Sequence, residues 1–331
     1  MNLTKQIEFR QFNKYIVKFK EIEEKHVWIN WVAAPIVTIA IFLVVYAIKG
    51  VYPFGGNTVS YYDMSGSSIP IYTFFWDVLH GKSGLYLNWY SGLGVSMADV
   101  VGAFLFFPTN LFFLFTSRDG IIYAMSFFVM YKMAICAFAM SFYYSKHYKD
   151  FTGALCSGLL YAFCGFAIQY YTNIFYFDLV ILFPFIVWSF EELLLKHKFK
   201  LFTILMFFAF FTNVQLVFMV GIYLLLKGYF LLKRVDESER SKSILLFAMS
   251  IIIALLLASF VLVPSISQTI QSTRSEENSG FDYINVMKSV YCKFRMQKYF
   301  MLYGSEIAVG LIILVFLRGK EIIRKYIENL V

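Results

Sequence analysis

Long apolar runs separated by short polar connections make up most of the chain. A helix needs ~20 mostly apolar residues to cross the hydrocarbon core of a bilayer. The apolar runs lie at about 29–49, 101–116, 121–144, 152–171, 176–195, 200–211, 214–232, 243–264 and 303–317. This pattern predicts an all-α polytopic membrane protein.

Three segments depart from a simple series of crossings. The 101–116 run contains the break "PTN", which predicts a re-entrant or outer-leaflet element. The 200–232 stretch predicts a hairpin of two short helices that turns at "TNVQ". In the segment 50–100, "IPIYTFFWDVLHGK" predicts an interfacial helix with aromatic side chains at headgroup level. We therefore expect about eight membrane helices.

Composition supports the bilayer as the main solvent. Of 331 residues, 60% are hydrophobic and 15% are charged, whereas a soluble domain has about a quarter charged. The net charge of +8 does not require a nucleic-acid partner, because the basic residues cluster beside the apolar runs.

The basic clusters orient the predicted spans. Cytoplasmic loops carry an excess of Lys and Arg, and placing every cluster inside makes the amino terminus cytoplasmic. The expected regions are a cytoplasmic amphipathic segment 1–28, a membrane core 29–264 with a first outer loop 50–120, an outer loop 265–302, and a last membrane helix with a basic tail 303–331. The expected location is the bacterial plasma membrane.

Several chemistries lack their signatures. The sequence has no nucleotide-binding glycine loop, no HExxH and no GxSxG. Three of the four cysteines fall inside apolar runs, and their spacing predicts neither a disulfide framework nor a metal site.

One acid, Asp63, lies in the stretch "YYDMSGSSIP" just after the first apolar run. In a Ser- and Gly-rich turn, an Asp side chain often hydrogen-bonds its own backbone. Alternatively, this carboxylate lies at the mouth of a membrane cavity, where it acts as a general base or holds a divalent cation.

Two charged residues lie within apolar runs. Asp178 is either an interfacial acid that reaches water or part of a site. Lys132, near the middle of its run, requires a partner, because an unpaired ammonium there costs at least ~2.5 kcal/mol. That partner is either a buried acid such as Asp178 or Asp99, or a lipid phosphate. Asp77 and Trp89 in the first outer segment could line the same mouth.

From residue 52 to residue 115 the chain resembles the first outer loop of YfhO-like bacterial membrane proteins, which are grouped with GT-C type, lipid-phosphosugar-dependent glycosyltransferases. The residues that carry the resemblance are Asp63, Pro70, Asp77, Trp89, Gly92-Leu93-Gly94 and Pro108-Thr109-Asn110, and further along Lys132, Asn173, Asp178, Pro184, Asn213 and Pro264. The family usually has Gln four residues after the first Asp, where this chain has Ser67. The chain is also shorter than typical members.

The resemblance implies a GT-C-like bundle and a reaction. A sugar on a polyprenyl-phosphate donor would be transferred at the outer face to a cell-envelope polymer such as a teichoic acid, with Asp63 as catalytic base. Lys132, Asp178, Asp77, Trp89 and Asn213 are expected to bind substrate. Asp63 and Asp178 are candidate ligands for Mg²⁺ or Mn²⁺. The rival hypothesis is a non-catalytic transporter or flippase of lipid-linked sugar, or a scaffold of cell-wall assembly.

Overall fold

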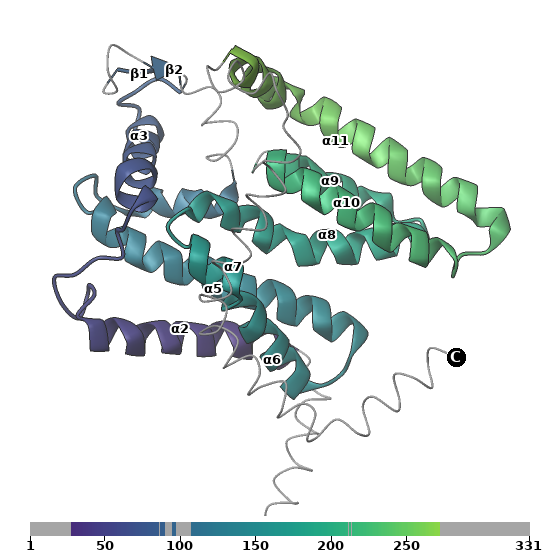
Figure 1. The fold of residues 1–331 in the computed structure, drawn as a ribbon, viewed down its shortest axis with the longest axis horizontal. Coiled ribbons are helices and arrows are strands. Elements are labelled where there is room, and N and C mark those ends of the chain that lie inside the picture. Colours follow the sequence, from purple (N-terminus) through teal and green to yellow (C-terminus); the bar gives the residue numbers. More distant parts are fainter. Residues whose placement is uncertain are drawn as a thin grey trace, which may run out of the picture.

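The computed structural model describes residues 28–85, 87–89, 95–96, 107–210, 212 and 214–271, and they are mostly helical (Figure 1). The elements are α2 (Ile29–Lys49), η1 (Met64–Ser68), α3 (Ile69–Leu79), β1 (Leu87–Asn88), β2 (Val95–Ser96), η3 (Pro108–Phe115), α5 (Ile121–His147), α6 (Phe151–Ala162), α7 (Gly165–Tyr170), η4 (Ile174–Tyr176), α8 (Phe177–Lys196), α9 (Phe199–Phe210), α10 (Val214–Leu232) and α11 (Glu237–Gln271). The two-residue strands β1 and β2 pair antiparallel.

Local sequence explains where several helices begin and end. Helix α2 stops at Gly50, whose φ of 60° is a left-handed conformation that glycine adopts without strain. Helix α6 begins after Asp150, whose carboxylate accepts a hydrogen bond from the backbone N–H of Gly153 at 2.7 Å. Pro108 occupies the first position of η3, where a missing N–H costs nothing.

The helices pack in two groups that meet along α5 and α8. Helices α2, α5 and α6 pack against one another, and α8 packs against α5, α9 and α10. Helix α11 lies on α9 and α8. In Figure 1, α3 and the small β-hairpin lie at one end of this bundle, and the connections that follow α5 and α10 lie at the other. We call these the α3 end and the basic end, respectively.

Length and composition agree with a membrane location. Within the described residues, five helical segments are long and apolar enough to cross a bilayer: Ile29–Lys49, Ile121–His147, Phe151–Tyr170, Ile174–Lys196 and Glu237–Pro264. Two shorter apolar helices correspond to the predicted hairpin at 200–232. The protein is thus an all-α polytopic membrane protein, as predicted. The expected span at 303–317 lies outside the described residues, as do residues 1–27 of the expected amphipathic segment 1–28 and residues 272–302 of the expected outer loop 265–302; residues 265–271 of that loop belong to α11.

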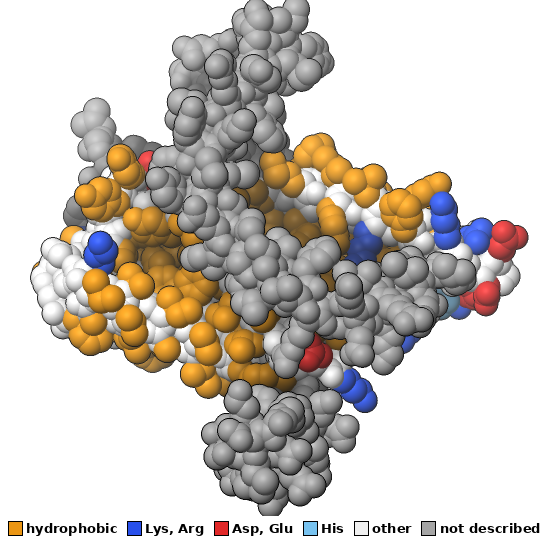
Figure 2. Space-filling view, turned by 60° about the horizontal axis from the view of Figure 1, so that its bottom comes forward, with side chains coloured by type: hydrophobic (Ala, Val, Ile, Leu, Met, Phe, Trp, Pro, Cys, Tyr) orange, Lys and Arg blue, Asp and Glu red, His pale blue; other side chains and the backbone are white. Residues whose placement is uncertain are grey.

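The surface separates apolar and charged side chains. Figure 2 shows hydrophobic side chains along the flanks of the helices and charged side chains gathered at the right, at the basic end. Ion pairs there join Lys196 and Lys198 to Glu192, and Lys242 to Glu239. A lipid-facing flank with charges at its edge is the distribution that a bilayer requires.

Two segments differ from the sequence-based expectation. The predicted single helix at 152–171 is interrupted between α6 and α7, where Cys164 is extended and Gly165 restarts the helix. Helix α3 is not an exposed interfacial helix: its aromatic side chains Tyr72, Phe74, Phe75 and Trp76 are buried against neighbouring elements. Packing inside the protein covers these rings, so they are not presented to lipid headgroups as we expected.

Candidate functional site

Asp63 lies at the start of η1, a short π-helical turn that continues into α3. The carboxylate is exposed and does not cap the turn, so the interpretation as a turn residue bonded to its own backbone is wrong. Instead, Oδ2 of Asp63 accepts a hydrogen bond from the side-chain amide of Asn173 at 3.0 Å. These two residues are 110 positions apart, so tertiary structure orients this acid.

A second contact fixes η1 against the same distant segment. The hydroxyl of Ser68 donates to the backbone carbonyl of Thr172 at 3.2 Å, and Ser68 is fully buried. The segment Thr172–Asn173 leads into η4 and then α8. The position of Asp63 is therefore tied at both ends of η1 to the connection that precedes α8.

Beneath this connection lies the ion pair of Lys132 and Asp178. The Lys132 ammonium is 2.8 Å from Oδ1 of Asp178, and their side chains are 0% and 1% exposed. Lys132 also donates to the carbonyl of Ile174 at 3.3 Å, and Thr109 donates to Asp178 at 2.8 Å. The pair thus joins α5, η3, η4 and α8.

This arrangement decides between the interpretations left open for the two residues. Lys132 is paired with a buried acid, and it has no exposed side-chain surface with which to contact a lipid phosphate. Asp178 is likewise not an interfacial acid that reaches water. The contacts of both residues lie within the protein, where they connect α5, η4 and α8.

Tyr72 of α3 extends the polar cluster. Its phenol donates to Oδ1 of Asn110 at 3.0 Å, and its ring stacks on Phe113 and Phe175. Burial, and then the nearby charge of Asp178, raise the pKa of the Tyr72 phenol well above its ordinary value. The phenol therefore stays protonated and remains a donor.

The other predicted substrate contacts lie elsewhere or outside the described residues. Asp77 forms a two-pronged pair with Arg118, with Nε–Oδ1 and Nη2–Oδ2 distances of 2.9 and 3.0 Å. Trp89 follows β1 and is 69% exposed, without a described contact to Asp63. Asn213 and Asp99 lie outside the described residues.

The described residues do not offer a ready cation site at Asp63 and Asp178. The Lys132 ammonium neutralises the charge of the Asp178 carboxylate. The same ammonium would repel a divalent cation, which requires anionic oxygen ligands. No group of three or more His, Cys, Asp or Glu side chains able to hold a metal occurs within the part of the chain that is described. Metal dependence stays a prediction, and titration of activity with a chelator tests it.

The cluster has two layers with different chemical capacities. An exposed carboxylate, Asp63, can accept a proton from a hydroxyl that approaches from water. Below it, the buried Lys132–Asp178 pair rigidly positions the connection that carries Asn173. Such support from buried polar groups keeps a reactive side chain in one orientation.

Sequence reasoning missed several contributors to this end of the molecule. The structural roles of Tyr72, Ser68 and Arg118 come from contacts across 38 to 104 positions. Lys49 was also overlooked. Lys49 is the last residue of the first apolar run, at the end of that run predicted to face outward, where Lys and Arg are less frequent than on the cytoplasmic side. A basic residue is unusual at this position, so the sequence could have drawn attention to it.

The helices and their buried ion pair define a polytopic helical membrane protein with a polar cluster at one end of its bundle. The chain belongs to the family described as bacterial membrane protein YfhO, whose model matches residues 34–329. No match was found among curated proteins or among solved structures.

Proposed function

We propose that the protein transfers a sugar from a polyprenyl-phosphate donor to a hydroxyl of a cell-envelope polymer, such as a teichoic acid, at the outer face of the membrane. The single observation that carries the proposal is the exposed Asp63 carboxylate held by Asn173 above a buried ion pair. Membership of the YfhO family supports a glycosyltransferase-like role.

The reaction assigns one proton transfer to this chain. Asp63 accepts the proton of the acceptor hydroxyl while the hydroxyl oxygen attacks the anomeric carbon of the donor sugar. The bond between that carbon and the phosphate oxygen breaks, and polyprenyl phosphate leaves with the electron pair. Attack opposite the leaving phosphate inverts the configuration at the sugar carbon.

The Asn173 amide positions the base for this step. As a donor to one carboxylate oxygen, Oδ2, it leaves Oδ1 to face the acceptor hydroxyl. Because Asn173 precedes η4, whose Ile174 carbonyl accepts from Lys132, the ion pair holds the amide in place. Holding the carboxylate in one orientation increases the rate of the transfer step, because the base is already placed for proton abstraction.

The membrane orientation that we propose rests on the distribution of basic residues between the two ends of the bundle. The α3 end carries Asp63, and the basic end carries the Lys- and Arg-rich connections that are typical of the cytoplasmic side. We therefore assign the α3 end to the outside, which gives the amino terminus a cytoplasmic location.

Exchange of Asp63 for Asn tests the proposal. The change removes the base with little change in volume, so transfer from a polyprenyl-phosphate sugar should fall by about a hundredfold or more at equal expression. Asp119→Asn is the matched control, since Asp119 is also exposed near the α3 end and has no described ion pair. Undiminished polymer glycosylation by Asp63→Asn would eliminate the enzyme hypothesis.

The rival function, a flippase of lipid-linked sugar, predicts a different pattern. A flippase moves its lipid without proton abstraction from an acceptor, so Asp63→Asn should leave lipid translocation in proteoliposomes intact. Translocation by the unmodified protein without any acceptor glycosylation would favour the flippase.

A further inference from the structure

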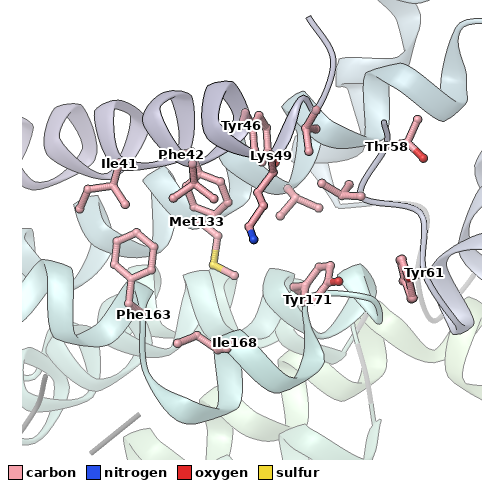
Figure 3. Close-up of a pocket in the computed structure, with 14 residues that line it drawn as sticks. Ile41, Phe42, Tyr46, Lys49, Thr58, Tyr61, Met133, Phe163, Ile168 and Tyr171 are labelled. Atoms are coloured by element: carbon pink, nitrogen blue, oxygen red, sulfur yellow. The ribbon is translucent and has the colours of Figure 1, made fainter. Parts of the chain in front are cut away.

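An apolar cavity of about 610 Å³ lies between α2, α5 and the 163–171 segment (Figure 3). Its walls include Ile41, Phe42, Val129, Met133 and Phe163. The volume falls within the ~300–1,000 Å³ typical of small-molecule sites. Because these side chains are apolar, the cavity is suited to bind a hydrocarbon chain.

The cavity borders an exposed apolar face of α2. Val44 and Ile48, which flank its lining residues on this helix, are 58% and 75% exposed. Exposed aliphatic side chains on a membrane-spanning helix contact acyl chains. A ligand longer than the cavity can therefore extend from it into the bilayer.

One charged side chain, Lys49, lines the cavity. Figure 3 shows its ammonium extending from the end of α2 into the hollow, toward the side that carries Met133 and Tyr171. Among the described residues, no carboxylate forms an ion pair with Lys49. An ammonium above apolar walls gains most from an anionic ligand, and phosphate is a preferred one.

The polar end of the cavity adjoins the Asp63 site. Tyr61, two residues before Asp63, and Tyr171, two residues before Asn173, both line the cavity. Since Asp63 and Asn173 are hydrogen-bonded, the two tyrosines flank the approach from the cavity to the base. Lys49 and these two tyrosines therefore line one cavity, next to the residues that hold Asp63.

We propose that this cavity, which we call the Lys49 groove, binds an isoprenoid phosphate lipid, with its phosphate at Lys49 and its first isoprene units against the apolar walls. The proposal rests on the proposed function, since it supplies the place of the donor lipid. It also moves the phosphate contact from Lys132, which is buried, to Lys49, which faces the hollow.

Binding of undecaprenyl phosphate to the purified full chain in nanodiscs tests the proposal. Lys49→Met should weaken binding by about tenfold or more, because it removes the charge and keeps the side-chain length. Lys49→Arg should bind nearly as the unmodified protein does. Lys82→Met is the control, since Lys82 is exposed at the α3 end and does not line the groove.

A second variant tests the apolar walls separately. Met133→Trp fills the groove, so it should weaken binding of both undecaprenyl phosphate and the uncharged undecaprenol, whereas Lys49→Met should affect only the phosphate. Unchanged affinity of Lys49→Met for undecaprenyl phosphate, or unchanged affinity of a folded Met133→Trp variant, would overturn the inference.

The binding assay separates this inference from the proposed function. Asp63→Asn should bind undecaprenyl phosphate normally, because Asp63 acts on the acceptor. Lipid binding that depends on Lys49, together with absent transfer, would keep the groove and remove the enzyme hypothesis. Transfer that depends on Asp63, together with lipid binding that does not depend on Lys49, would support the enzyme hypothesis and overturn the Lys49 groove.

Discussion

The ammonium of Lys132 lies 2.8 Å from the carboxylate of Asp178, and both side chains are almost completely buried. The pair connects the middle of α5 to the first turn of α8, at the point where the two helix groups meet. Loss of either member would leave the other as an uncompensated charge in the protein interior, which is strongly destabilising.

Removal of one member of this pair should destabilise the protein more than removal of both. Lys132→Met and Asp178→Asn each leave one buried charge without a partner, which costs about 3–5 kcal/mol in the free energy of unfolding. The double variant should recover much of that loss. Denaturant titration in detergent micelles measures all three. A double variant no more stable than the singles would show that the pair is not the relevant interaction.

Loss of the Asn173 amide should slow transfer without unfolding the protein. Asn173→Ala leaves Asp63 in place but frees its carboxylate to rotate, so the rate should fall by about tenfold to a hundredfold. Initial rates of sugar transfer, at equal protein, measure the effect. Asn88→Ala, in β1 at the same end, serves as control. An equal loss in both variants would argue against a positioning role for Asn173.

The Asp77–Arg118 pair should respond asymmetrically to substitution. The Asp77 side chain is 4% exposed, whereas that of Arg118 is 42% exposed. Arg118→Met therefore leaves a buried carboxylate without its main partner, but Asp77→Asn leaves an arginine that water can solvate. We expect a larger decrease in melting temperature for Arg118→Met. Equal decreases would mean that the burial of Asp77 is not what makes the pair important.

Helix α6 should not tolerate a methyl group at Gly158. A Cβ atom there would lie 2.7 Å from the Ala137 carbonyl oxygen of α5 and 2.7 Å from the Ala34 Cβ of α2. Small residues at such contacts let membrane helices approach closely, so Gly158→Ala should cost about 1–3 kcal/mol of stability through overpacking.

Gly221→Ala is the matched control for this contact. A Cβ at Gly221 in α10 meets no heavy atom within 4 Å, so the change should be neutral or stabilising through helix propensity. Thermal unfolding of both variants in the same detergent measures the difference. A destabilised Gly221→Ala with an unaffected Gly158→Ala would contradict the packing of α2, α5 and α6.

The order of apolar runs predicted most of the long helices, but not the break between α6 and α7. The run at 29–49 coincides with α2, and the described part of the broken run at 101–116 forms the short η3, which begins at Pro108 because proline cannot continue a helix from the residues before it. These features depend on local chemistry and on the bilayer thickness, both of which are readable along the chain.

The sequence also singled out Asp63, Asp178 and Lys132 as unusual charges in an apolar chain, because an ionised group in hydrocarbon requires a reason. It could not assign their partners. Only the tertiary structure decided that Lys132 pairs with Asp178, that Asn173 orients Asp63, and that Lys49 faces a hollow. The physical reason is range: helix formation depends on neighbours a few positions apart, whereas these contacts join residues 46 to 110 positions apart, whose meeting is set by how the helices pack.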